Sequence, residues 1–174
     1  MFNNNYYMQL YGYTSSEQVS NMGEYFLITE KQTIENFFHE LEQDGVVADY
    51  SLISLSSVLQ WSMGRATLLS QITEILNTIE GEAVNEEIEA KKSYNISEIL
   101  SLLWHSAYYV AETYRRSGNA MRWETSPKLA MRGFRDAEKM YPVDEIYSLY
   151  NDILEYKDIL SEVEGFILKW TVKL

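Results

Sequence analysis

The chain has 174 residues, a formal net charge of −12 at pH 7 and no cysteine. This length suffices for one domain with a real apolar core, and we expect residues 1–174 to form a single domain. The lack of cysteine excludes disulfides and thiolate metal sites. The strong negative charge argues against direct binding of nucleic acid, whose phosphates must be neutralised by cations.

Targeting and membrane signals are not evident in the sequence. Residues 1–13 lack the basic start and the sustained apolar run of a signal peptide. No stretch reaches the roughly 20 apolar residues that cross a bilayer. We therefore expect a cytoplasmic protein that does not enter a membrane.

The N-terminal segment predicts two short strands around a short helix. Residues 6–13 are rich in tyrosine, which favours a strand. A threonine and a glutamate three residues apart then form a capping box for a helix over 15–22, which Gly23 ends. The run over 24–28 is apolar and aromatic, and is too short for a separate helix, so it predicts a second strand.

Two helices are predicted next. The first begins near Thr33 and ends before Gly45, which suits the left-handed position after a helix. The second covers 52–79, where apolar residues recur every three or four positions. A strand over 58–63 competes with it, but the helical pattern continues far beyond that stretch. Gly64 inside this helix indicates a break or a close helix crossing.

The most apolar helix is predicted over 96–116. It follows an acidic segment, 82–92, that predicts an exposed linker or a weak helix. A capping box marks its start at Asn95, and two arginines before a Ser-Gly stop mark its end. Two adjacent apolar stripes make it a central helix that is packed from more than one side. Its remaining, polar face is predicted to hold Glu98, Ser101, His105, Tyr109, Glu112 and Arg116.

After the central helix, the chain predicts a loop, two helices and a final strand. Ser126-Pro127 begins the first of these helices, because serine caps helices well and proline fits the first helical position. Pro142 begins the second, which Gly165 interrupts. Residues 166–174 alternate apolar and polar side chains, which predicts a strand. The alternative is that the last helix simply continues.

These elements together predict a predominantly helical α+β fold. It contains five or six helices and a small antiparallel sheet formed by the N- and C-terminal segments. The alternative is an all-α bundle. No internal repeat or low-complexity segment indicates a repeat architecture.

The two histidines are the first candidates for catalysis or metal binding. His39 begins the run His-Glu-Leu-Glu-Gln, in which Gln43 occupies the place of the second histidine of a zinc-protease motif and cannot replace it as a ligand. His105 lies on the polar face of the central helix. A metal-dependent or other enzyme that uses His39 and His105 is an alternative function, but the spacing of these residues predicts neither a metal site nor a cofactor.

The basic residues of this acidic chain are concentrated in one segment. Residues 115–139 hold seven of the fourteen basic residues and three acidic ones, so this segment carries +4 and the rest of the chain −16. We expect either internal pairing with acids over 144–164, or a basic patch for an anionic ligand or an acidic partner. The candidate partner-binding residues are Arg122, Trp123, Arg132, Arg135, Tyr109, Glu86, Glu87 and Glu89.

The function class that the sequence favours is a non-catalytic binding protein that inhibits or neutralises another protein. Small size, acidity, surplus tyrosine and the lack of a catalytic motif favour it. Examples are immunity proteins, antitoxins and phage-encoded inhibitors, and the expected partner is a toxin or a nucleic-acid-binding protein. The alternatives are the enzyme above and a subunit of an oligomeric assembly.

Overall fold

The computed structural model describes residues 22–79, 86–118, 121–125 and 129–174. In chain order, the elements are α3 (Met22–Gln43), α4 (Leu52–Asn77), α5 (Glu86–Ser117), β1 (Arg122–Glu124), β2 (Ala130–Arg132), a 3-10 helix (Arg135–Ala137), β3 (Lys139–Met140), α6 (Pro142–Tyr156) and α7 (Ile159–Thr171). The three strands form an antiparallel sheet in the order β1-β2-β3. The prediction of a predominantly helical α+β fold with a small antiparallel sheet is therefore confirmed.

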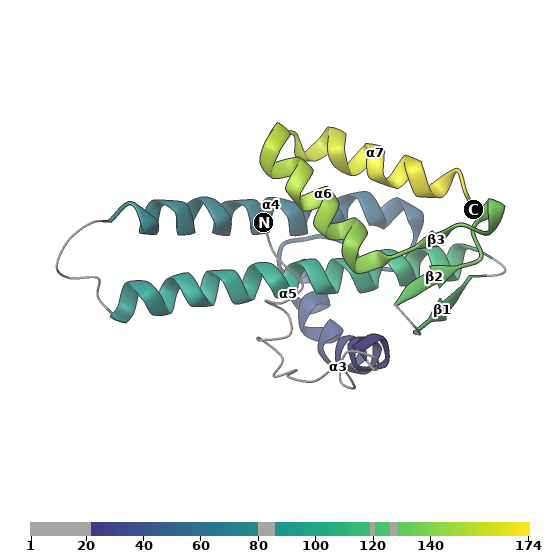
Figure 1. The fold of residues 1–174 in the computed structure, drawn as a ribbon, viewed down its shortest axis with the longest axis horizontal. Coiled ribbons are helices and arrows are strands. Elements are labelled where there is room, and N and C mark those ends of the chain that lie inside the picture. The colour runs from purple at the N-terminus through teal and green to yellow at the C-terminus, as the bar shows by residue number, and fades with distance from the viewer. Residues whose placement is uncertain (1–21, 80–85, 119–120, 126–128) are drawn as a thin grey trace.

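The two longest helices, α4 and α5, form an antiparallel hairpin that organises the molecule (Figure 1). α6 and α7 pack on one side of this hairpin, and α3 lies on the other. The sheet lies beside the C-terminal end of α5. At the opposite end, the last turns of α4 and the first turns of α5 extend beyond the other helices as an arm.

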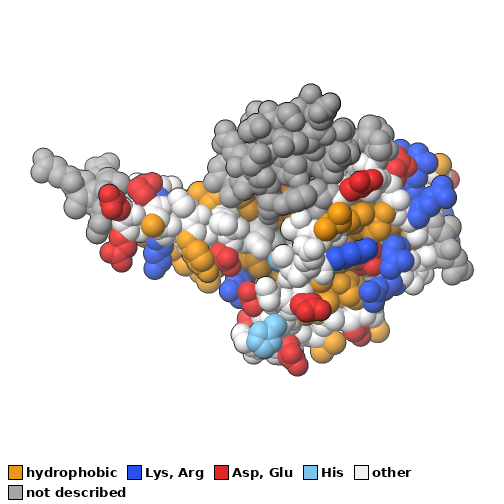
Figure 2. Space-filling view, turned by 90° about the horizontal axis from the view of Figure 1, so that it is seen from below, with side chains coloured by type: hydrophobic (Ala, Val, Ile, Leu, Met, Phe, Trp, Pro, Cys, Tyr) orange, Lys and Arg blue, Asp and Glu red, His pale blue; other side chains and the backbone are white. Residues whose placement is uncertain are grey.

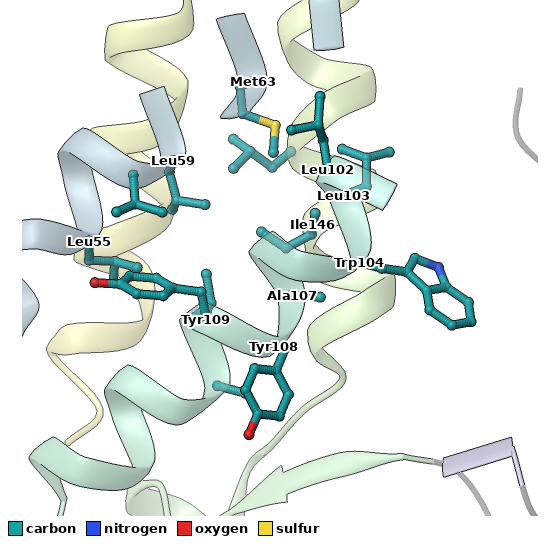
Figure 3. Packing of buried hydrophobic residues seen from close by; sticks show 14 of the residues in the cluster. Leu55, Leu59, Met63, Leu102, Leu103, Trp104, Ala107, Tyr108, Tyr109 and Ile146 are labelled. Carbon is teal, nitrogen blue, oxygen red and sulfur yellow. The ribbon is translucent and has the colours of Figure 1, made fainter. Parts of the chain in front are cut away.

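The core is built around the middle of α5. Leu103 is fully buried, and Leu59 of α4 and Ile146 of α6, both also fully buried, lie around the same interior (Figure 3). Trp104 points elsewhere, and its ring packs against Phe26 of α3 with the ring centroids 5.2 Å apart. Because α5 contacts α3, α4 and α6, the prediction of a central helix packed from several sides is confirmed.

The helix α3 replaces one predicted strand. The strand predicted over 6–13, and all but the last residue of the helix predicted over 15–22, lie outside the described residues. The strand predicted over 24–28 is wrong, because α3 runs through it without interruption. Packing gives this segment a helical period, as the buried Phe26 and Glu30 show.

The helix predicted over 52–79 is confirmed as α4. Its cap is Ser51, whose hydroxyl accepts a hydrogen bond from the backbone N–H of Ser54 at 3.1 Å. Gly64 is neither a break nor a close crossing. A Cβ atom placed there would meet only the side chain of Ile159, at 3.8 Å, which is an ordinary contact.

The predicted start of the central helix at Asn95 is wrong. α5 begins at Glu86, so much of the acidic segment forms its first turns, where carboxylates compensate the positive end of the helix dipole. Asn95 is buried inside the helix, and its amide Nδ2 donates a hydrogen bond to Thr73 Oγ1 of α4 at 3.2 Å. A good capping residue therefore joins two helices instead of starting one.

The helix predicted to begin after Ser126 is wrong over the described residues 129–140, which form β2, the 3-10 helix and β3. Three residues, Gly133, Asp136 and Ala137, have φ angles of 116°, 62° and 57°, which an α-helix does not accommodate. Arg132, Arg135 and Lys139 therefore lie on short strands and in the 3-10 helix.

The strand predicted over 166–174 is also wrong, and the alternative of a continuing helix is correct through Thr171. Val163, Phe166 and Trp170 are buried at helical spacing against the rest of the core. The sheet that the structure describes is therefore formed by the segment between α5 and α6, and the C-terminal segment takes no part in it.

Gly23 lies in the first turn of α3, where the helix backbone meets the residue after β1. A Cβ atom at Gly23 would lie 2.8 Å from the carbonyl oxygen of Thr125, which is a backbone atom and cannot turn aside. We expect Gly23→Ala to lower the free energy of unfolding by about 1–3 kcal/mol through this overpacking. Urea unfolding measures the change.

Gly165 provides the matched control. It lies inside α7, although the sequence predicts an interruption there, and a Cβ atom would meet nothing within 4 Å. Gly165→Ala should raise the free energy of unfolding by about 0.5–1 kcal/mol, because alanine loses less backbone entropy in a helix. Equal effects of the two substitutions would contradict the close approach of α3 to Thr125.

Candidate functional site

The last turns of α5 hold a buried carboxylate that gathers several predicted site residues. Glu112 is only 5% exposed. Its two oxygens accept hydrogen bonds from Arg115 Nε and Nη2, each at 2.8 Å, and Trp123 Nε1 of β1 donates to the same group at 2.7 Å. Arg116 Nε lies 3.7 Å from it. Burial raises the pKa of Glu112, but the hydrogen bonds from Arg115 and Trp123 lower it by more, so this pKa lies below its ordinary value.

A second carboxylate forms ion pairs with two cations of the sheet. Glu124 of β1 forms ion pairs with Arg132 of β2 and with Lys139 of β3, whose Nζ donates to Glu124 Oε1 at 2.8 Å. The register of β2 and β3 places Arg132 opposite Lys139, so one carboxylate reaches both. The hydrogen bond from Lys139 is the largest cause of a lowered pKa of Glu124.

Stacked rings cover the same end of α5. The ring of Tyr108 stacks on Trp123, with the centroids 6.2 Å apart. Tyr50, in the connection between α3 and α4, stacks on Tyr109 with the centroids 4.8 Å apart, and the Arg116 guanidinium lies 3.9 Å from the centroid of the Tyr50 ring. Tyr50 has a φ angle of 59°, which is uncommon for a bulky residue. The Arg116 cation is therefore held by an aromatic ring and a carboxylate.

Figure 2 shows the consequence at the surface. Lys and Arg side chains gather at the end of the molecule opposite the arm, interleaved with acidic and apolar side chains. The acids that pair with these cations are Glu112, Glu124 and, through Lys173, Glu138. Internal pairing of the basic segment is thus observed, although the partners come from α5 and the sheet segment, whereas the sequence predicted acids over 144–164.

The eight predicted site residues do not form one site. Arg122 and Trp123 lie on β1, Arg132 on β2 and Arg135 in the 3-10 helix. Arg122 and Arg135 are exposed and have no ion-pair partner within the described ranges. The three acids lie in the first turn of α5, at the tip of the arm and far from the sheet (Figure 1): Glu86, Glu87 and Glu89.

The prediction of Tyr109 as a partner-binding residue is wrong. The sequence predicts it on the polar face of the central helix, but it is fully buried and offers no surface to a partner. Its hydroxyl oxygen lies 2.7 Å from Ser54 Oγ and accepts a hydrogen bond from the backbone N–H of Tyr50 at 3.0 Å. The connection before α4 covers this face of α5, so Tyr109 serves the fold.

The histidines do not meet in a metal site. His105 is nearly buried, and its Nδ1 lies 2.6 Å from Glu30 Oε2 of α3. His39 is exposed, and its Nε2 lies 2.9 Å from the amide of Gln43. Within the part of the chain that the structure describes, no group of three histidine, cysteine, aspartate or glutamate residues could hold a metal ion.

The turn between α6 and α7 carries two exposed apolar side chains. Tyr156 is 63% and Leu160 52% exposed. Lys157, at φ 59°, caps the end of α6 in the left-handed conformation and turns the chain there. The adjoining turns of α6 and α7 carry the acids Asp152, Glu155, Glu162 and Glu164. We call Tyr156, Leu160 and these four acids the acidic hairpin surface.

Two further results bear on the function. None of the helices in the described residues is long and apolar enough to cross a lipid bilayer. Comparisons of the chain with protein-family models, with curated proteins and with solved structures give no match.

Proposed function

We propose that this protein is a non-catalytic, acidic binding protein of the cytoplasm that inhibits or neutralises a protein partner with a basic surface. Immunity proteins, antitoxins and phage-encoded inhibitors work in this way. The observation that carries the proposal is the unequal use of charged side chains in ion pairs. Most lysine and arginine side chains in the described residues pair with carboxylates. The four acids of the acidic hairpin surface, in contrast, have no ion-pair partner there.

This difference makes the available surface more acidic than a plain count of charges suggests. A basic partner would gain ion pairs at the acidic hairpin surface without breaking pairs that stabilise the fold. At the basic end, an acidic partner would have to compete with Glu112 and Glu124 for the same cations. The geometry therefore favours the acidic hairpin surface over the basic segment as the place of contact.

The apolar side chains of the acidic hairpin surface supply the second requirement of a protein interface. Binding energy at interfaces is concentrated in a few side chains, often tyrosines, that lose contact with water and are surrounded by polar groups. Tyr156 and Leu160 are exposed on consecutive helices, whose adjoining turns carry carboxylates. Acids of this kind accelerate association through long-range attraction, and salt weakens the effect.

The test captures a partner and then weakens one surface. The tagged full chain is incubated with an extract of its source cells at low ionic strength. We expect it to retain a protein rich in lysine and arginine, which added salt releases. The purified partner should lose its own activity when the wild-type chain is added in equal amount. Tyr156→Ala and Glu155→Lys should each weaken its binding at least about tenfold, as loss of a central contact does.

Glu35→Lys serves as the matched control, because Glu35 is exposed on α3, away from the acidic hairpin surface. It makes the same change of charge and should reduce affinity much less than Glu155→Lys. A partner that binds all variants equally, or that keeps its activity in the complex, would contradict the proposal. Retention of no protein at all would contradict it as well.

A further inference from the structure

At Gly64, the side chain of Ile159 still lies against α4. Beyond Gly64, the outer face of α4 is exposed. Leu68 and Ile75 are 56% and 64% exposed, and Ile79, in the turn that ends α4, is 49% exposed. Together with the partly exposed Ile72, these residues recur every three or four positions and share one face. We call Leu68, Ile72, Ile75 and Ile79 the arm stripe.

The arm stripe carries no charge. Between Ala66 and Ile79, the only ionised side chain is Glu74. Adjacent helix positions point about 100° apart, so Glu74 does not share the face of Ile75. The charge of the Glu74 carboxylate contributes to the raised pKa of Tyr150 on α6. Glu74 therefore lies on the side of α4 that faces α6, away from the arm stripe. An isolated arm of a soluble helical hairpin is usually polar outside, and a helix that is apolar on several sides is usually covered.

We infer that the arm stripe binds the same stripe of a second copy of this chain, and that the two arms pack antiparallel as a four-helix bundle. Two molecules that each carry −12 repel one another, and this repulsion is weakest where the facing surfaces lack charge, as on the arm stripe. A stripe that lies across a two-fold axis is complementary to itself, as the commonest protein dimers require.

The antiparallel direction follows from the shape of the molecule. The other helices and the sheet lie at one end of the α4–α5 hairpin (Figure 1). Parallel arms would bring two acidic bodies together at the same end, whereas antiparallel arms place them at opposite ends. The midpoint of the stripe lies between Ile72 and Ile75, so Leu68 of one copy faces Ile79 of the other.

The same antiparallel register places opposite charges of the two copies at the same height along the bundle axis. Asn95 of α5 is level with Thr73 of α4, because their side chains are hydrogen-bonded. Glu86 lies about nine residues beyond Asn95 toward the tip, and Arg65 lies the same distance from the stripe midpoint on the other side. In the antiparallel pair, the acidic tip of one arm therefore comes level with Arg65 of the other copy, whose guanidinium also lies 3.1 Å from Glu40 of its own chain.

The exposed apolar area of the stripe limits the affinity of the dimer. The stripe spans roughly 16 Å and offers roughly 400 Å² of exposed apolar surface, about half of what each partner contributes to a stable interface. We therefore expect a reversible dimer with a dissociation constant in the micromolar range. This inference goes beyond the proposed function, and its test uses no partner protein, so the two can fail separately.

The first experiment follows the molecular mass of the full chain by sedimentation equilibrium over a concentration series. We expect a monomer–dimer equilibrium for the wild type and at least about tenfold weaker dimerisation for Ile75→Glu, which buries a charge on pairing. The matched control is Ile53→Glu on the same helix, because Ile53 is 89% exposed and lies outside the stripe. Its dimerisation should equal that of the wild type.

A second experiment tests the register and does not depend on a charged substitution. The chain has no cysteine, so single cysteines report defined contacts. A mixture of Leu68→Cys and Ile79→Cys chains should form a mixed disulfide dimer, while Leu68→Cys alone should form little. A wild type that stays monomeric at millimolar concentration would overturn the inference in favour of a different protein on the stripe. Weakening by Ile53→Glu to the same degree, or self-linking of Leu68→Cys, would overturn it too.

Discussion

Leu103→Ala is expected to lower the free energy of unfolding by about 3–5 kcal/mol, the range for a fully buried leucine that leaves a cavity. Leu103 has no exposed surface and lies in the middle of α5. It belongs to the same buried cluster as Leu59 of α4 and Ile146 of α6, which Figure 3 shows in one interior. The truncation therefore leaves a cavity between packed helices. Chemical unfolding in urea, followed by far-ultraviolet circular dichroism, measures the loss.

The control for this substitution removes the same atoms from the surface. Leu168 of α7 is 64% exposed, so Leu168→Ala leaves no cavity and should change the free energy of unfolding by less than about 0.5 kcal/mol. A loss of less than about 1 kcal/mol for Leu103→Ala would mean that α4, α5 and α6 do not share one core. The comparison therefore tests the architecture as well as the single side chain.

Glu112→Ala is expected to lower the free energy of unfolding by about 2–3 kcal/mol, because it removes several hydrogen bonds to an ionised group. Arg115 and Trp123 both donate to Glu112, and the Nε1 of the half-buried Trp123 would be left without this acceptor. The same contacts attach β1 to the end of α5. We therefore also expect faster amide hydrogen exchange in the sheet of this variant.

The effect should depend on pH in a defined direction. The pKa of Glu112 is lower in the folded chain than its ordinary value of 4.5. The stabilisation by Glu112 is therefore complete above pH 4.5 and is lost as the pH falls through the lower pKa of the folded state. The difference in stability between wild type and Glu112→Ala should be constant near neutral pH and shrink in acid. Glu164→Ala, an exposed control on α7, should show neither effect.

The proposed dimer and the proposed inhibitor function use different parts of the surface. The acidic hairpin surface lies at the turn between α6 and α7, whereas the arm stripe lies on α4 beyond Gly64. A dimer would present two acidic hairpin surfaces, so a partner with two basic sites would bind more tightly than a partner with one.

Several helices were predictable because strong local signals agree with the fold. Pro142 begins α6, as proline at the first helical position predicts. Gly45 follows α3 in the left-handed region, and Ser117-Gly118 ends α5. The long apolar period of α4 and α5 predicted a helical core, since no other structure places so many apolar side chains on one side. The predominantly helical α+β class follows from these segments.

Two of the errors occurred where a short run fits two periods. Residues 166–174 alternate like a strand, yet Phe166 and Trp170 are also four apart, and the contacts of α7 with α4 select the helix. The residues between α5 and α6 show the reverse. The apolar residues of this segment, such as Phe134 and Met140, were predicted to face the core from a helix. The chain instead turns through residues with positive φ angles and forms paired strands.

The sequence by itself determined the helical class, the C-terminal ends of α3, α4 and α5, the lack of thiol chemistry and the acidic balance of the chain. The tertiary structure alone decided which charges remain available and which apolar side chains stay in water. Glu112 looks like any acid on a polar face until Trp123 covers it, and Leu68 looks like any core leucine until α7 stops short of it. Periodicity reports which residues share a face, whereas only packing decides what that face meets.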